Sequence, residues 1–284
     1  MGDIVLLKDI IEEKEGLLLD VEGTLITKVE GGEPYLDAEE FLFKVRGMPI
    51  ILITNLARRS SKHLSSVLRR MGLDFSPEEI INPTKAAAGR ILDVEFEKPV
   101  RVFLISEGGH LEDLSEYDWI EFVREEPVDA VLLGASRDIT YQQLNFAFRV
   151  ILKGATLIVL GGDLWAEGSQ FGDVGPYLME GAFARALEAA ANISARYVGK
   201  PNKEIFEEAL SRLRISRERV VLIGDSIYSD IIGAYRAQID AILIDREGIK
   251  RNKLLEYLKR EDTYQSNIYI TRSLRLESVL ERVV

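Results

Sequence analysis

Polar side chains that can do chemistry stand directly after three apolar segments of this chain. The apolar segments, residues 17–19, 50–53 and 220–223, are followed by Asp20, by Thr54 and Asn55, and by Gly224 and Asp225. An unbroken apolar run of this length is typical of a strand that is buried on both faces of a parallel sheet. Ligands bind beyond the carboxyl ends of such strands, so we expect these polar side chains to meet in one crevice.

Two more charged residues fit the same crevice. Lys200 lies in a Gly-Lys-Pro turn, and Asp230 follows Asp225 at about the point where the next helix should begin. Acids that converge repel one another unless a cation lies between them, and carboxylates without His or Cys suit Mg²⁺. A metal ion, a lysine, a hydroxyl and backbone N–H groups together would hold a phosphoryl group and neutralise its charge during transfer.

Asp20 is best interpreted as a nucleophile, because a carboxylate can accept a phosphoryl group to give an aspartyl-phosphate. Glu22 lies across the following turn and would act first as general acid and then as general base. Each residue alone also has an ordinary structural interpretation: a turn at Asp20, a helix cap at Thr54 and Asn55, a solvated surface lysine at Lys200. Their joint occurrence at successive strand ends favours a site.

Composition excludes several classes of function. The chain has 284 residues, a formal net charge of −11, no cysteine and two histidines, His63 and His110. The acidic balance argues against a nucleic-acid partner, and the cysteine and histidine counts exclude disulfides and a Cys- or His-rich metal centre. No apolar run reaches the length of a membrane span and the N-terminus does not resemble a signal peptide, so we expect a cytoplasmic protein without a membrane partner.

Alternating strand and helix patterns predict an α/β fold with a Rossmann-like parallel sheet. The alternation begins in residues 1–82, where residues 1–15 should cover the sheet edge, and it ends in residues 180–284. Residues 83–179 restart the pattern and are large enough for an inserted α/β domain. We expect the helix over residues 177–191 to return the chain to the first domain, and the tail to end in a helix near residues 274–283.

Four short motifs carry a family resemblance. They are Asp20-Val21-Glu22-Gly23-Thr24, Thr54-Asn55, Gly199-Lys200-Pro201, and Gly224-Asp225-Ser226 extended to Asp230. In this order they resemble the motifs of the haloacid dehalogenase superfamily of phosphatases. The insertion between the second and third motifs is similar to the class IIA (C2-type) cap of the NagD-like, 4-nitrophenylphosphatase subfamily. The resemblance implies a core of residues 1–82 and 180–284 with a cap of residues 83–179.

The resemblance also implies metal-binding roles. Asp20 would be the phosphoryl acceptor, and it would bind Mg²⁺ together with Asp225 and the backbone carbonyl of Glu22. Asp230 would support the metal site through a water molecule or through a contact with the residues that bind the metal.

The remaining motif residues would bind phosphate, according to the same resemblance. The Thr54 hydroxyl and the Asn55 amide would hold it, and Lys200 would neutralise charge between Asp20 and the phosphate. The implied activity is Mg²⁺-dependent hydrolysis of a small phosphorylated metabolite or an aryl phosphate through an aspartyl-phosphate. The implied partners are this substrate and a second copy of the chain, paired through the cap.

Two departures from the family pattern bear on activity. Glu22 stands where the first motif carries Asp, and a misplacement of about 1 Å can cost on the order of a hundredfold in rate. A phosphate-binding or regulatory protein without turnover is therefore the alternative function. In the cap, Gly161-Gly162-Asp163 replaces the subfamily's Asn-x-Asp. Asp163 and Trp165 are our candidates for substrate contacts there, and an ordinary turn beside an exposed aromatic is the alternative.

Two other folds with clustered acids or a nucleotide site fit less well. A receiver-type phosphoaspartate switch also uses clustered acids, a Thr and a Lys, but receivers are shorter and have no inserted domain. A nicotinamide-binding Rossmann protein needs a Gly-x-Gly-x-x-Gly turn, which does not follow the first apolar segment.

Overall fold

The computed structural model describes residues 5–56, 58–170, 173–261 and 266–284. The chain forms two compact units, which we call the core unit (residues 1–54, 64–81 and 200–284) and the inserted unit (residues 55–63 and 82–199). Both units alternate strands and helices around a sheet, which confirms the predicted α/β class.

The core unit is built on an eight-stranded sheet with the strand order β1-β15-β14-β13-β12-β2-β3-β4. Pairing is parallel from β14 to β4 and antiparallel at β15 and β1. The strands are β1 (Val5–Leu6), β2 (Gly16–Leu19), β3 (Ile50–Ile53), β4 (Ile80–Ile81), β12 (Val220–Gly224), β13 (Asp240–Ile244), β14 (Ile268–Thr271) and β15 (Val279–Arg282). β2 is buried along its whole length, as expected for a central strand of a parallel sheet.

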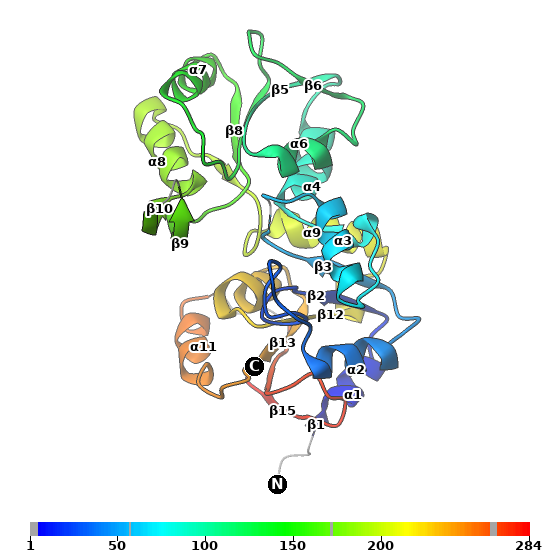
Figure 1. The fold of residues 1–284 in the computed structure, drawn as a ribbon. Helices are drawn as coiled ribbons and strands as arrows, with labels where there is room; N and C mark the ends of the chain where they lie inside the picture. Colours follow the sequence, from blue (N-terminus) through cyan, green and yellow to red (C-terminus); the bar gives the residue numbers. More distant parts are fainter. Residues whose placement is uncertain (1–4, 57, 171–172, 262–265) are drawn as a thin grey trace. The chain divides into compact units, whose positions relative to one another are not determined.

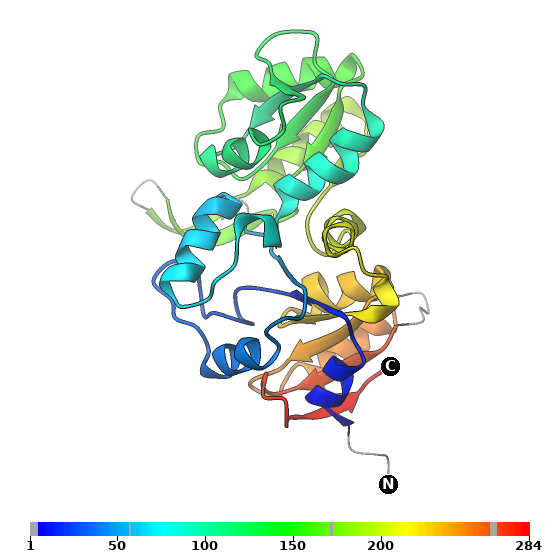
Figure 2. The same ribbon diagram turned by 90° about the vertical axis from the view of Figure 1, so that its right-hand side faces the viewer.

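The two ends of the described chain meet at one edge of this sheet. β1, in blue, lies beside β15, in red, and the register joins Val5 to Leu280 (Figure 1, Figure 2). Residues 279–282 therefore form a strand, and the prediction of a helix near residues 274–283 is wrong. Only Leu280 of β15 is buried, and the strand depends on pairing with β14 and β1.

Helices of the core unit follow its strands. They are α1 (Leu7–Glu12), α2 (Leu36–Lys44), α3 (Ser61–Arg70), α9 (Lys203–Leu213), a π-helix (Ile227–Ile232), α10 (Gly233–Arg236) and α11 (Arg251–Leu258). α3 begins among the residues grouped with the inserted unit and continues in the core unit.

The inserted unit contains a five-stranded parallel sheet with the order β11-β8-β7-β5-β6, and a separate antiparallel ribbon, β9-β10. The strands are β5 (Val100–Ile105), β6 (Ile120–Phe122), β7 (Ala130–Leu133), β8 (Thr156–Val159), β9 (Trp165–Gln170), β10 (Asp173–Leu178) and β11 (Arg196–Tyr197). The helices are α4 (Pro83–Ala87), which continues as a π-helix (Ala88–Leu92), α5 (Asp93–Glu95), α6 (Gly108–Leu114), α7 (Tyr141–Leu152) and α8 (Glu180–Ala191).

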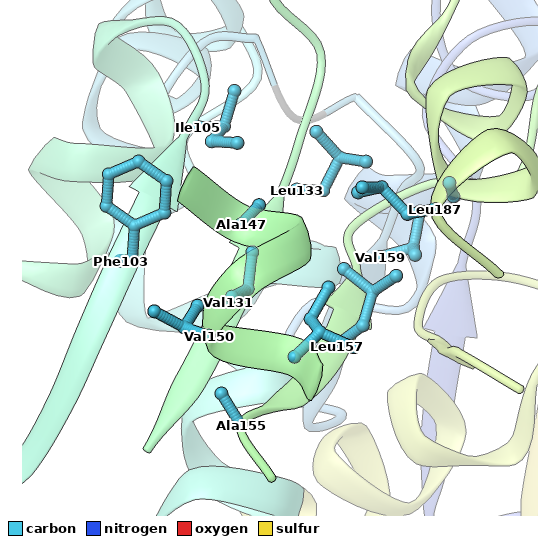
Figure 3. Close-up of a cluster of buried hydrophobic side chains, with 12 residues drawn as sticks. Phe103, Ile105, Val131, Leu133, Ala147, Val150, Ala155, Leu157, Val159 and Leu187 are labelled. Atoms are coloured by element: carbon cyan, nitrogen blue, oxygen red, sulfur yellow. The ribbon is translucent and has the colours of Figure 1, made fainter. Parts of the chain in front are cut away.

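α8 belongs to the inserted unit. Its Leu187 packs into an apolar cluster with Val159 of β8 and Val150 of α7 (Figure 3). The expected boundary at residue 180 differs from this division, since the apolar face of α8 covers the inserted sheet and the chain joins the core unit only at Lys200. The expected helix over residues 177–191 likewise starts later, at Glu180, after β10.

A buried aspartate ties together the segments where the chain joins the inserted unit. Asp113 of α6 is fully buried and accepts hydrogen bonds from the Ser61 amide (2.9 Å), the Ser61 hydroxyl (2.8 Å) and the Asn82 side-chain amide (2.6 Å). Ser61 begins α3, and Asn82 caps α4 through the Lys85 amide. One carboxylate therefore fixes the starts of both helices.

This contact predicts a large stability loss for Asp113→Ala. The substitution leaves buried donors of Ser61 and Asn82 without their acceptor, which should cost roughly 2–4 kcal/mol in the free energy of urea unfolding. Glu112→Ala removes an exposed carboxylate from the same helix and is the matched control. Equal losses in the two variants would contradict the assigned role of Asp113.

Candidate active site

Three carboxylates meet at one edge of the core sheet. Among the described residues, Asp20, Asp225 and Asp230 each offer an oxygen, and these atoms lie within 4.8 Å of one another. Asp20 follows β2 and Asp225 follows β12, which are neighbouring parallel strands paired at Leu19 and Ile223. Because the two strands end at the same level, the residues that follow them are brought together.

Two glycines permit this close approach. A side chain at Gly23, which has a φ of +84°, would place its Cβ 2.6 Å from Cγ of Asp225. A side chain at Gly224 would place its Cβ 2.6 Å from Cβ and Cγ of Asp230. Two of the three glycines in the sequence motifs therefore make room for carboxylates.

Lys200 binds two of the three acids. Its Nζ donates to Asp20 Oδ1 (2.5 Å), to Asp230 Oδ1 (2.6 Å) and to the carbonyl of Ile53 at the end of β3 (2.9 Å). Burial works to lower the pKa of Lys200, but the charges of Asp20 and Asp230 outweigh it and raise the pKa above its ordinary value. The lysine is therefore a permanent cation in the site.

The carboxyl group of Asp20 is held at both oxygens. Lys200 binds Oδ1, and the Thr24 hydroxyl donates to Oδ2 at 3.0 Å. Burial, followed by repulsion from Asp230, raises the pKa of Asp20 to about 7, although Lys200 opposes the shift. The three carboxylates outnumber Lys200, which suits a divalent cation.

Asp230 is also supported from its own loop. It is fully buried in the π-helix, and its Oδ2 accepts the Ser226 amide at 2.9 Å. Since Lys200 and Ser226 occupy its two oxygens, Asp230 is suited to a supporting role, whereas Asp225 is half-buried. An oxygen-only set of this kind fits a hard divalent ion.

Glu22 lies on a tightly held turn. The amide of Gly23 donates to the carbonyl of Ile26 (2.8 Å), and the Val29 amide donates to Glu22 Oε1 (2.6 Å). Arg246 donates to the Thr24 carbonyl (3.1 Å) from the same turn. The side chain of Glu22, which is longer than the Asp of the family motif, is thus held by a backbone amide. Metal binding by the Glu22 carbonyl remains a prediction.

Thr54 and Asn55 follow β3. Thr54 is buried, and its amide donates to the Ile81 carbonyl of β4 (3.0 Å). Asn55 is exposed and is grouped with the inserted unit, where a side chain at Gly199 would approach its Oδ1 to 3.1 Å. Their roles toward phosphate remain predictions.

Asp163 and Trp165 lie in the inserted unit. The Asp163 carbonyl accepts the Gly181 amide (3.1 Å), and Trp165 begins β9 with 58% of its surface exposed. A side chain at Gly161 would collide with the carboxylate of Glu180. A side chain at position 161, where the family resemblance implies Asn, would thus require Glu180 to move. Substrate contacts by Asp163 and Trp165 remain predictions.

Two residues of the site have no place in the sequence-based assignment. Thr24 belongs to the first motif, and its spacing of four residues from Asp20 is the signal that would have found it. Lys250 donates to Asp225 from the loop after β13, and the sequence carries no signal for it because the contact spans 25 residues.

The described residues include no helix with the length and hydropathy needed to cross a bilayer.

Comparisons with known proteins follow the same motifs. The model of the haloacid dehalogenase-like hydrolase family matches residues 17–120, and the HAD-hydrolase-like model matches residues 197–269. Phospholysine phosphohistidine inorganic pyrophosphate phosphatase of Homo sapiens is 34% identical over 237 residues, which cover 81% of this chain and 82% of that protein. The chain belongs to the haloacid dehalogenase-like hydrolases.

Other members of this family are similar over most of their length. An acid sugar phosphatase of Staphylococcus aureus (strain USA300) is 25% identical over 235 residues, covering 82% of this chain and 86% of that protein. The solved structure of a p-nitrophenyl phosphatase from Archaeoglobus fulgidus superimposes with a TM-score of 0.78 at 25% identity, covering 93% of this chain and 97% of that one. These likenesses confirm the resemblance that the motifs indicated.

The crowding of Asp20 predicts an unusual pH dependence for the metal-free protein. A folded pKa of about 7, raised from 3.8, means that the stability linked to this group is present at low pH and is lost as pH rises through about 7. Asp20→Asn removes the carboxyl group whose ionisation lowers the free energy of unfolding. In EDTA at pH 8 we expect this variant to exceed wild type by roughly 1–3 kcal/mol in urea unfolding, with the difference shrinking toward pH 5.

The exposed Asp118→Asn variant is the control and should show no such trend. An Asp20→Asn protein that is less stable than wild type at pH 8 would contradict the crowding argument.

Proposed function

We propose that this protein is a Mg²⁺-dependent phosphatase that hydrolyses a small phosphorylated metabolite or an aryl phosphate through an aspartyl-phosphate. The observation that carries the proposal is the cluster of Asp20, Asp225 and Asp230, two of them buried, with Lys200 bound to Asp20 and Asp230. Membership of a hydrolase family whose similar members are named phosphatases supports it.

The metal would be held by Asp20, Asp225 and the carbonyl of Glu22, with Asp230 behind them. Hard oxygen ligands without nitrogen or sulfur favour Mg²⁺ among the common cellular ions. When bound, the ion would neutralise charge on the phosphoryl oxygens.

The chain's own residues would carry the bond changes. A carboxylate oxygen of Asp20 attacks phosphorus as the bond to the leaving oxygen breaks, and Glu22 gives that oxygen its proton. Glu22 then takes a proton from water, which attacks phosphorus and releases Asp20. Lys200 holds Asp20 in position during both steps, and the Thr54 hydroxyl and Asn55 amide would bind the phosphoryl oxygens.

The substrate class is proposed in broad terms, because the similar phosphatases carry different names. Those names refer to phospholysine and phosphohistidine, to acid sugars and to p-nitrophenyl phosphate. A phosphoryl group on a small molecule is common to them, carried on nitrogen in phospholysine and phosphohistidine and on oxygen in p-nitrophenyl phosphate. Asp163 and Trp165 in the inserted unit remain our candidates for contacts with the rest of the substrate.

Pairing of two copies through the inserted unit is part of the same proposal. Trp165 and Leu178 face each other across the β9-β10 ribbon and are 58% and 61% exposed. A two-stranded ribbon is marginal alone, so covering these side chains would stabilise it. We also propose a cytoplasmic location, without membrane or nucleic-acid partners.

The test is turnover of a phosphorylated-metabolite panel that includes 4-nitrophenyl phosphate, with Mg²⁺ and with EDTA. We expect Mg²⁺-dependent release of phosphate, and Asp20→Asn should lower kcat by at least about a thousandfold because the acceptor is gone. A circular dichroism spectrum like that of wild type and a cooperative unfolding transition would show that the variant is folded. Turnover by Asp20→Asn would remove the nucleophile assignment.

The role of Glu22 can be tested with an isosteric change. In Glu22→Gln the side-chain oxygen can still accept the Val29 amide, so the turn is kept and only the transferable proton is lost. We expect kcat/KM to fall about 10²- to 10⁴-fold for an alkyl phosphate, whose leaving group needs a proton. The loss for 4-nitrophenyl phosphate should be smaller, because its leaving group is already stable as an anion.

Equal losses on the two esters would argue that Glu22 acts structurally. If wild type is inactive but Glu22→Asp hydrolyses 4-nitrophenyl phosphate, the phosphate-binding alternative would replace the proposal.

A further inference from the structure

The loop after β13 is shaped by its own first residue. Asp245 is buried and accepts the backbone amides of Gly248 (2.9 Å), Ile249 (3.1 Å) and Lys250 (2.7 Å). Gly248 has a φ of +74°, which permits the tight turn. These three hydrogen bonds fix the backbone from which the Lys250 side chain extends.

Lys250 delivers a second ammonium to the carboxylate cluster. Its Nζ donates to the Asp225 carbonyl at 2.6 Å and lies 3.2 Å from Asp225 Oδ2. Gly23 packs on the same carboxylate, since a Cβ there would lie 2.6 Å from its Cγ. Asp225 is thus confined between a glycine turn and a lysine, and about 30% of the Lys250 side chain is exposed.

The charges explain why this second lysine matters. Three carboxylates and Lys200 alone would leave an excess of two negative charges when all groups are ionised. Lys250 halves that excess, so a divalent ion leaves the site positive rather than neutral. With the ion bound, a site of net positive charge binds a phosphoryl dianion more strongly than a neutral site does. Without Lys250, the more negative group of ligands would bind the cation more tightly.

We propose that Lys250 is a positioning residue of this site that holds Asp225 before a divalent cation binds and, once the cation is bound, keeps the site positive for an anionic phosphoryl group. The anion part rests on the proposed function, and the cation part does not. Lys250 therefore weakens cation binding and strengthens anion binding. A lysine that only supports the fold would affect both in the same direction.

Lys250→Met separates these possibilities. Loss of the ammonium removes its repulsion toward the ion, which outweighs the small rotamer freedom that Asp225 regains. We expect the dissociation constant for Mg²⁺, measured by calorimetry on the full chain, to fall about five- to tenfold. The dissociation constant of inorganic phosphate at saturating Mg²⁺ should rise by about the same factor.

Two further variants complete the design. Lys253→Met removes the same charge from an exposed position of α11 and should leave both constants unchanged. Lys250→Arg keeps the charge and should restore both toward wild type. High salt should reduce the effect of Lys250→Met, because Lys250 is partly exposed and its charge is screened.

The inference is overturned if Lys250→Met leaves Mg²⁺ binding unchanged or weakens it. It is also overturned if phosphate binding does not weaken, or if Lys253→Met has the same effects. Neither measurement needs turnover. If the protein hydrolyses phosphate esters but Lys250→Met changes neither dissociation constant, the proposed function stands and this inference fails. If the protein is inactive but Lys250→Met binds Mg²⁺ more tightly and phosphate more weakly, the inference stands and the proposed function fails.

Discussion

The buried ammonium of Lys200 is the interaction on which the site depends. Isolated charges are costly to bury, and a buried carboxylate is tolerated only when it is paired and hydrogen-bonded. Lys200 binds Asp20 and Asp230 at once and is anchored to β3 through the Ile53 carbonyl. Without it, the ends of β2 and β12 could not present acids in a buried edge of the sheet.

Lys200 does not fully offset the effects of burial and of Asp230 on Asp20. Asp20 retains a pKa near 7 because burial and Asp230 outweigh Lys200. A divalent ion bound at the proposed site would relieve the repulsion between these carboxylates, at some cost to the stability of the metal-free state. Gly23 and Gly224 make the crowding possible, and the ordered loop at Asp245 brings Lys250 to the side that Lys200 does not reach.

Much of the core followed from local rules that the sequence displays. The apolar runs before Asp20, Thr54 and Asp225 predicted central strands, because both faces of a parallel sheet are buried. The strand within residues 274–283 could not be predicted in this way, since β15 forms by pairing with β14 and β1. The expected boundary at residue 180 placed α8 in the core for a similar reason. The apolar face of a helix indicates that it packs on a sheet but does not identify the sheet.

Site residues outside the motifs were hidden for the same physical reason. Lys250 looks like any other lysine of a charged loop, and its contact with Asp225 depends on hydrogen bonds that Asp245 accepts from the loop backbone. Thr24 could be named as part of the first motif, but only the fold of the turn aims its hydroxyl at Asp20. Sequence patterns locate strand ends, whereas the contacts between loops require the folded sheet.

The two departures from the family motifs differ in kind. Glu22 is a longer acid on a turn that holds it, since the Val29 amide binds one oxygen and Arg246 fixes the Thr24 carbonyl. The change lengthens the side chain and keeps a carboxyl group. At Gly161, by contrast, the space of an Asn side chain is taken by the Glu180 carboxylate.

Among the described residues, Glu180 Oε2 is buried without a hydrogen-bond partner, and burial raises the pKa of this group to about 7. An acid from α8 thus lies beside position 161, where the family resemblance implies an amide. An acid that is neutral or charged near pH 7 makes different hydrogen bonds from an amide. Substrate preference therefore cannot be transferred from relatives that carry Asn at this position, even though the chemistry of the core unit can.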